Sequence, residues 1–187
     1  MRAFVAIAVA PPALDSVADA LARLREEVPA VRWVRPETVH VTLHFFADLS
    51  EDDVPRVLGA VGAAVEGAAP FDVRLGSYGS FADRGTPRVL WLGVDGGAGE
   101  LSRLAAAAED ALVRAGFTAE PRPFRAHCTI GRPRVPWPDV ARRAWKSAVA
   151  PAFSAFTCDR VTLFESVPER GGTRYVVRGI APFAVRS

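Results

Sequence analysis

Two short segments of the chain place a histidine two residues before a threonine. Residues 40–43 read HVTL and residues 127–130 read HCTI. The chain has only three histidines, and two of them open this repeated pattern. A single His-x-Thr segment in a strand is usually a packing feature, but two copies that use two of three histidines favour a functional set. The four side chains of this set are His40, Thr42, His127 and Thr129.

Histidine and threonine in this pattern can hydrolyse a phosphodiester. An imidazole has an unperturbed pKa of about 6.5, so a neutral and a protonated histidine can coexist near pH 7. The neutral ring takes a proton from water, and the protonated ring gives one to the leaving oxygen. Threonine hydroxyls donate hydrogen bonds to the phosphate oxygens on which charge develops. We therefore expect acid–base catalysis by His40 and His127, with phosphate contacts from Thr42 and Thr129 and with no metal or cofactor.

Both segments also have the composition of β-strands. Side chains two apart on a strand face the same side, so each histidine shares a face with its threonine while the residue between them faces the core. The two histidines are 87 residues apart (127 minus 40), nearly half of the 187-residue chain. A helical pattern precedes each segment. We therefore expect a duplicated unit whose two lobes face each other across a cleft.

The third histidine, His44, shares its strand parity with His40. Four residues along a strand span about 13 Å, which is too far for the two rings to bind one ion. The sequence contains no Cys/His cluster with metal-binding spacing. We expect no metal site, and we place His44 at the rim of the cleft or on the surface.

The remaining elements indicate a mixed α+β fold. Apolar residues recur at helical spacing in some segments and alternate in others. Several strands follow one another without a crossover helix, which favours antiparallel pairing. We expect a single bilobal domain over residues 1–187, with antiparallel sheets lining a central cleft and helices packed outside. The expected helices span 12–28, 50–65, 99–115 and 139–149, and the expected strands span 3–9, 39–46, 71–75, 88–94, 124–130, 156–164 and 174–180.

Composition limits the class of protein. Half of the residues are hydrophobic and the formal net charge is +2, which is ordinary for a globular protein and does not by itself indicate a nucleic-acid binder. No apolar run reaches the roughly 18 residues that a membrane helix needs. We expect a cytoplasmic monomer that does not bind membranes. In that compartment Cys128 and Cys158 are expected to be free, buried thiols.

Four blocks of the sequence resemble the 2H phosphoesterases, and among them the RNA 2′,3′-cyclic phosphodiesterases, which are also called 2′-5′ RNA ligase-like proteins. The blocks lie at 2–7, 32–46, 87–94 and 124–132, and their order covers essentially the whole chain. The departures are small or apolar replacements that leave both histidines and both threonines intact: Ala126 stands where the family usually has proline, Cys128 and Ile130 where it has leucine, and Ala47 where it has glycine.

The resemblance implies a bilobal α+β fold with a pseudo-two-fold axis through the cleft. It implies hydrolysis of RNA that ends in a 2′,3′-cyclic phosphate to a 2′-phosphomonoester, with His40 as proton donor and His127 as acceptor. The family also places an arginine after the second motif near the phosphate, and Arg132 matches it. The strand parity of Arg132 is opposite to that of His127, so its side chain reaches the site only if the strand ends or bulges there.

Two other functions fit the same motifs. The substrate could instead be a small cyclic nucleotide or an ADP-ribose cyclic phosphate, because the motifs recognise only the phosphate. The chain could also be a non-catalytic module that binds RNA ends, although a matched acid–base pair is not needed for binding. Reversible 2′-5′ ligation is chemically compatible with hydrolysis, since the two reactions differ only in the nucleophile.

Overall fold

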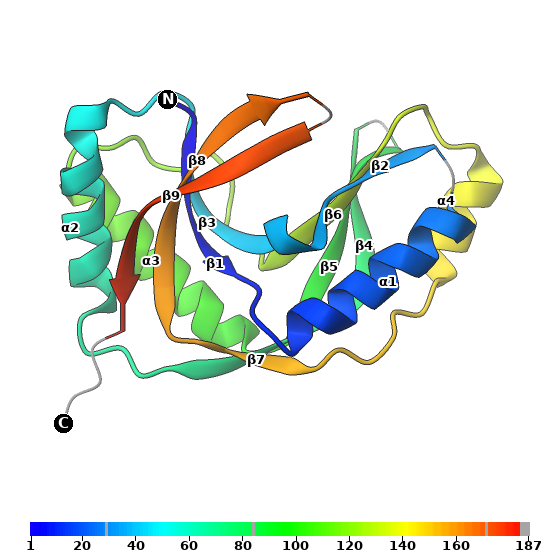
Figure 1. Ribbon diagram of the computed structural model, residues 1–187, viewed down its shortest axis with the longest axis horizontal. Coiled ribbons are helices and arrows are strands. Elements are labelled where there is room, and N and C mark those ends of the chain that lie inside the picture. The colour runs from blue at the N-terminus through cyan, green and yellow to red at the C-terminus, as the bar shows by residue number, and fades with distance from the viewer. Residues whose placement is uncertain (29, 84, 171, 184–187) are drawn as a thin grey trace.

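The computed structural model describes residues 1–28, 30–83, 85–170 and 172–183 (Figure 1). Its helices are α1 (Ala13–Glu27), α2 (Val54–Val65), α3 (Ala98–Arg114) and α4 (Asp139–Ser147), with 3-10 turns at Pro36–Thr38 and Glu51–Asp53. Its strands are β1 (Ala3–Ala8), β2 (Val31–Trp33), β3 (His40–Phe46), β4 (Phe71–Asp83), β5 (Thr86–Gly96), β6 (His127–Pro133), β7 (Ala155–Cys158), β8 (Arg160–Glu169) and β9 (Gly172–Pro182).

The described strands form one antiparallel sheet in the order β7-β4-β5-β6-β3-β1-β8-β9, and β2 pairs with β6 beside β3. The strands β3 and β6 meet at the centre through the pair Val41 and Cys128. Helices α2 and α3 cover the half that contains β3, β1, β8 and β9, whereas α1 and α4 cover the other half (Figure 1). The predicted α+β class is confirmed, but the two expected sheets are the halves of a single sheet.

The two halves repeat one another around that central pair. In the first half, β1 leads into α1 and the chain then returns as β3, and in the second half β5 leads into α3 and returns as β6. Each helix crosses to the other half of the molecule: α1 contacts β2, which pairs with β6, and α3 contacts β3. The crossing helices tie the two halves together, so each half depends on the other for its apolar cover.

Each motif strand also carries a bulge at the same place. In the β1–β3 pair, Ala6 is opposite Thr42 but Val5 is opposite His44, so Leu43 is an extra residue. In the β5–β6 pair, the partners of Trp91 and Leu90 are residues 129 and 131, so the extra residue is at position 130. A bulge reverses the alternation of faces beyond it. The duplication expected from the motifs therefore extends to the backbone irregularity that follows them.

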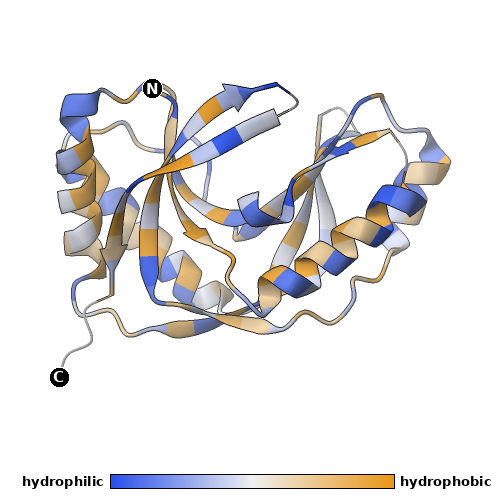
Figure 2. Cartoon of the chain, viewed as in Figure 1, coloured by the Kyte–Doolittle hydropathy of each residue, from blue (hydrophilic) through white to orange (hydrophobic). Residues whose placement is uncertain are grey.

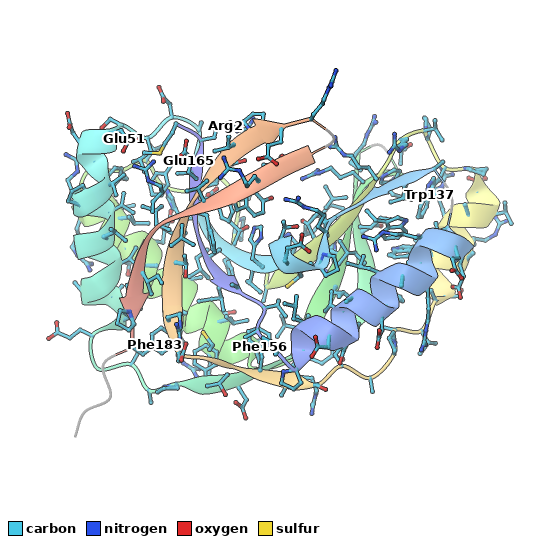
Figure 3. The ribbon with its side chains drawn as sticks, viewed as in Figure 1. Arg2, Glu51, Trp137, Phe156, Glu165 and Phe183 are labelled. Atoms are coloured by element: carbon cyan, nitrogen blue, oxygen red, sulfur yellow. The ribbon has the colours of Figure 1, made fainter. Side chains whose placement is uncertain are left out.

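The apolar core runs through both halves. Buried side chains labelled in Figure 3 mark its extent, with Trp137 beside α1 and α4 and with Phe156 and Phe183 at the base of the sheet. Figure 2 shows that α1 and α4 carry strongly hydrophilic residues among apolar ones, as expected for helices with one face in solvent. The described helices include none that is both long and apolar enough to cross a membrane.

The structure corrects the strand predicted over 156–164. That stretch contains the end of β7 and the start of β8, and the two strands lie in opposite halves of the sheet. β7 pairs with β4, whereas β8 pairs with β1 and β9. Residues 156–158 alternate between buried and exposed, and buried residues resume at Val161 after an interruption of only two residues, Asp159 and Arg160. So short an interruption resembles an irregularity within one strand, and the pairing partners show that there are two.

Other predicted boundaries also move. The strand predicted at 71–75 continues to Asp83, because β4 and β5 form one long hairpin. The strand predicted to start at residue 124 starts at His127, and it ends at Pro133 instead of residue 130. Helix α4 ends two residues before its predicted end, at Ser147. These shifts leave both histidine motifs inside their strands.

Cys128 on β6 and Cys158 on β7 are free and buried, as predicted. Burial raises the pKa of the Cys128 thiol far above its usual range and that of the Cys158 thiol to about 12. Because the reactive species is an exposed thiolate, neither side chain should react with a disulfide reagent at pH 8 while the protein is folded. Thiol titration should detect almost none in buffer and both in denaturant, and rapid reaction of a native thiol would contradict the burial.

Candidate active site

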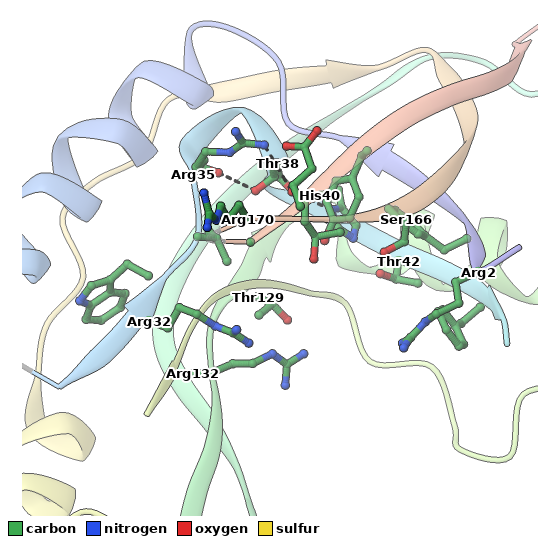
Figure 4. Close-up of a pocket in the computed structure, with 18 residues that line it drawn as sticks. Arg2, Arg32, Arg35, Thr38, His40, Thr42, Thr129, Arg132, Ser166 and Arg170 are labelled. Carbon is green, nitrogen blue, oxygen red and sulfur yellow. Dashed lines mark hydrogen bonds between the residues drawn. The ribbon is translucent and has the colours of Figure 1, made fainter. Parts of the chain in front are cut away.

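A cleft of about 700 Å³ opens over the centre of the sheet. Its walls come from β3, β6, β2 and the β8–β9 hairpin (Figure 4). Four of the five residues predicted from the motifs line it, namely His40, Thr42, Thr129 and Arg132. His127 is not among the lining residues, but it begins the strand that carries Thr129 and Arg132. The cleft therefore gathers residues from both motifs.

The register of β3 against β6 sets how the motifs meet. Val41 is opposite Cys128, so in antiparallel register His40 lies beside Thr129, and Thr42 lies beside His127. Each histidine thus faces the threonine of the other motif. The two imidazoles are also close enough for the charge of His127 to lower the pKa of His40. This arrangement places two rings and two hydroxyls around one point above the central pair.

The two histidines are oriented by the same hydrogen bond. Nδ1 of His40 donates to the carbonyl oxygen of Thr38 at 2.7 Å, and Nδ1 of His127 donates to the carbonyl oxygen of Arg125 at 2.7 Å. In both cases the carbonyl belongs to the residue two positions earlier in the chain. A carbonyl oxygen can only accept, so Nδ1 carries the proton in each ring. The Nε2 atom of each histidine is therefore the one that can exchange a proton with a ligand.

Aromatic side chains enclose both rings and lower their basicity. Phe4 stacks on His40 with ring centroids 4.6 Å apart, and Tyr175 meets the same ring edge-on at 5.3 Å. Phe81 meets His127 edge-on at 4.8 Å. Burial is the main cause that lowers the pKa of His40 to about 4, and it also lowers the pKa of His127. Both rings are therefore neutral at pH 7 when the cleft holds no anion.

The cleft is strongly cationic although the whole chain is nearly neutral. Its lining includes one carboxylate, that of Glu169, which is ion-paired with Arg174 at 2.5 Å. Its five lining arginines are Arg2, Arg32, Arg35, Arg132 and Arg170 (Figure 4). Such a concentration of one charge in a concave site attracts anions and raises their local concentration. The arginine-rich composition of the chain concealed this cluster, because only the fold brings together five arginines from separate segments.

Arg132 reaches the cleft because of the bulge in β6. Simple alternation would place its side chain on the face opposite to Thr129. The extra residue at Ile130 reverses the alternation, and Ile130 and Gly131 are consecutive buried residues. Arg132 is then exposed on the cleft side of the strand. The predicted strand parity required a bulge or a strand end for Arg132 to reach the site, and the strand has such a bulge.

The matching bulge in β3 corrects the prediction for His44. Its side chain is only 2% exposed and lies at neither the cleft rim nor the surface. The extra residue Leu43 turns His44 to the helix-covered side, where its Nδ1 is 2.7 Å from Oε2 of Glu109 on α3. The next residue, Phe45, lines the cleft at the position that corresponds to Arg132. The prediction for His44 was wrong because it assumed that side chains alternate regularly along the whole strand.

Glu109 links the first motif strand to the loop before the second. Besides contacting His44, its carboxylate accepts a hydrogen bond from the Glu120 backbone N–H at 2.6 Å. The Glu120 side chain in turn accepts one from the Phe45 backbone N–H at 2.6 Å. Residues 117–126 lead directly to His127, so this network fixes the approach to the second motif from the end of the first.

Comparison with known proteins gives one matching family model, described as the 2′-5′ RNA ligase superfamily, over residues 11–169. An RNA 2′,3′-cyclic phosphodiesterase of Archaeoglobus fulgidus is 35% identical over 141 residues, which are 75% of this chain and 77% of that protein. A protein of the same name from Thermotoga maritima is 27% identical over 177 residues, which are 95% of this chain and 92% of that protein.

Solved structures share the fold. A crystal structure of a Thermus thermophilus protein superposes with a TM-score of 0.80 at 24% identity, covering 98% of both chains. The crystal structure of E. coli LigT complexed with 3′-AMP superposes with a TM-score of 0.73 at 24% identity, also covering 98% of both chains. At this identity the likeness concerns the fold alone, and it agrees with the duplicated architecture described above.

The network around Glu109 predicts a stability effect. Glu109→Ala removes the acceptor of the Glu120 N–H and leaves the buried His44 without its partner, which should lower the free energy of unfolding by about 1–3 kcal/mol. Glu100→Ala is the matched control, because Glu100 lies on the same helix in an exposed ion pair with Arg103. That change should cost at most about 1 kcal/mol. Urea denaturation of both variants measures the difference, and equal losses would show that the network is not structural.

Proposed function

The chain belongs to the 2′-5′ RNA ligase superfamily, and within it to the RNA 2′,3′-cyclic phosphodiesterases, and we propose that it hydrolyses a 2′,3′-cyclic phosphate at an RNA end to a 2′-phosphomonoester. The observation that carries the proposal is the paired orientation of His40 and His127. Both rings hold their Nδ1 proton against a backbone carbonyl and leave Nε2 free. Proton transfer needs this tautomer, whereas anion binding alone does not.

In the proposed reaction, Nε2 of His127 takes a proton from water, and the oxygen of that water attacks phosphorus. The bond between phosphorus and O3′ breaks, and Nε2 of His40 gives its proton to O3′. The hydroxyls of Thr42 and Thr129 and the guanidinium of Arg132 donate to the non-bridging oxygens as charge develops there. The product keeps its phosphate on O2′, and the pair of histidines is restored by exchanging protons with solvent.

To act as the acid, His40 must be protonated, but its ring is neutral at pH 7 when no anion is bound. Burial lowers the pKa of His40 to about 4. A bound phosphate places a negative charge beside the ring, and an opposite charge at this range favours the protonated imidazole. Substrate binding therefore raises the basicity of the pair, so that the acid is charged mainly in the complex.

The competing functions are less well supported. A cyclic phosphate on a small nucleotide would use the same histidines and threonines, but it would leave most of the five lining arginines without an anion. Ligation through a 2′-5′ linkage would run the same proton transfers in reverse, with a ribose hydroxyl in place of water. We propose hydrolysis as the main reaction, because water is the more abundant nucleophile. The protein is proposed to act as a monomer.

The first prediction for this function concerns the two histidines. His40→Ala and His127→Ala should each lower kcat by roughly 10²–10⁴, the usual size of one proton-transfer role. The double variant should lose much less than the product of the two, because the residues act as a unit. His44→Asn is the control, since His44 is on the same strand but turned away from the cleft, and it should retain activity within about tenfold.

The assay uses an RNA that ends in a 2′,3′-cyclic phosphate, with chromatography to identify the product and circular dichroism to verify folding. A 2′-phosphomonoester supports the proposed direction of cleavage. A 3′-phosphomonoester would reverse the assignment of the leaving oxygen, and a folded His127→Ala protein with normal turnover would exclude the two-histidine mechanism.

The second prediction concerns pH. Since kcat/KM reports the free enzyme and the pKa of each histidine is lowered there, its bell-shaped profile should reach its maximum below pH 6.5. Activity should fall as pH rises from 6.5 to 8, because the fraction with one protonated ring decreases. The profile of kcat should lie at higher pH, since bound phosphate raises both pKa values. A kcat/KM that increases steadily to pH 9 would indicate a different base.

The third prediction concerns metal ions. Within the described ranges, no group of three or more His, Cys, Asp or Glu side chains is arranged to hold a metal. The proposed mechanism assigns every proton transfer and phosphate contact to protein side chains. Exhaustive treatment with EDTA should therefore leave kcat unchanged within error. Loss of activity that Mn²⁺ or Zn²⁺ restores would replace the mechanism with a metal-dependent one.

A further inference from the structure

Arg32 and Arg132 lie directly opposite each other across two strands. The register of β2 against β6 pairs Trp33 with Gly131 and Arg32 with Arg132. Directly opposite residues have Cβ atoms about 5 Å apart, and like charges in that position destabilise the pair. Both side chains line the cleft and extend toward the side of Thr129 (Figure 4). An anion bound between the two guanidinium groups would therefore stabilise this pair of cations.

No carboxylate within the described part of the chain supplies that anion. Neither Arg32 nor Arg132 forms an ion pair or hydrogen bond with a described residue. Arg170, which also lines the cleft, likewise forms none with a described residue, whereas Arg35 and Arg2 have side-chain contacts within the protein. Arg35 pairs with Glu37 at 3.4 Å and donates to the Thr173 carbonyl oxygen, and Arg2 lies over the Phe45 ring. The opposed pair therefore differs from Arg2 and Arg35 in having no ion pair, hydrogen bond or ring contact with a described residue.

One reacting phosphate neutralises only one of the two arginines. A cyclic phosphodiester carries a single negative charge on two non-bridging oxygens. In the proposed reaction these oxygens accept from the hydroxyls of Thr42 and Thr129, and the planar fork of Arg132 adds two parallel donors. The single charge of that phosphate is thus matched by the charge of Arg132. The charge of Arg32, beside it, is left without a counter-charge.

We propose that Arg32 binds a second phosphate, the one on the 5′ side of the terminal nucleotide. This inference rests on the proposed function for the position of the first phosphate, and it specifies how the chain end is recognised. Chain ends and 5′-phosphorylated nucleotides should bind in preference to cyclic mononucleotides with a free 5′-hydroxyl. The guanidinium groups extend from Cβ atoms about 5 Å apart, so they can hold two phosphates that flank one ribose. A phosphate contact of this kind is independent of base identity.

Binding of product-like nucleotides tests the subsite without turnover. Adenosine 2′-phosphate carries only the phosphate of the reaction site, and adenosine 2′,5′-bisphosphate adds only the second one. Isothermal titration calorimetry should show that the parent protein binds the bisphosphate about tenfold more tightly, as expected for one added charge-assisted contact. Arg32→Gln should abolish that preference and leave the affinity for the monophosphate within about twofold. Arg32→Lys should keep part of it, because lysine retains the charge but loses the bidentate fork.

Two control variants separate a specific contact from the general positive field. Arg114→Gln removes the same charge from the exposed last turn of α3 and should change neither affinity. Arg170→Gln removes another cleft charge, and it should retain most of the preference for the bisphosphate. Equal loss in Arg170→Gln and Arg32→Gln would show a field effect and overturn the subsite.

The remaining outcomes also decide the proposal. Equal affinity of the parent protein for both nucleotides would exclude a second phosphate site. An Arg32→Gln protein that loses affinity for both alike would show that Arg32 serves the reacting phosphate instead. Neither result depends on catalysis, so failure of the subsite is distinguishable from failure of the proposed reaction, which the cyclic-phosphate assay tests separately.

Discussion

The antiparallel register at Val41 and Cys128 is the constraint on which the rest of the site depends. This central pair joins the two halves of the sheet, and it lies inside both His-x-Thr motifs. A shift of one residue would turn one motif to the opposite face, because side chains alternate along a strand. The buried residue at the centre of each motif therefore has a functional consequence: its packing fixes the face on which His40 and His127 appear.

The two bulges convert a symmetrical scaffold into an asymmetrical site. In each strand the extra residue comes directly after the threonine of the motif, and it reverses the faces on which the following side chains lie. In one half the reversal brings Arg132 to the cleft, and in the other it brings Phe45 there and buries His44 against Glu109. The backbone repeats, but one side offers a cation and the other an aromatic ring.

Burial disfavours charged imidazoles in the cleft, whereas the cleft arginines attract an anion that stabilises them, so the site responds to ligand. Aromatic neighbours remove water from the imidazoles, and the resulting desolvation favours their neutral forms. The arginines draw an anion into the same space. An anion that binds there compensates both effects, since it partners the guanidinium groups and stabilises a protonated histidine. The protonation state that the chemistry needs is therefore coupled to occupancy.

Alternation and residue type are local properties, so they predict the α+β class, the strand that carries each motif and the side chains at the start of that strand. The tertiary structure decided what alternation cannot express: the bulges that admit Arg132 and bury His44, and the division of residues 156–164 between opposite halves of the sheet. The arginine cluster also belongs to the fold, since its members come from separate segments in an arginine-rich chain. Pairing partners lie far away in sequence, and register is a property of two strands together, so a single strand's pattern does not contain it.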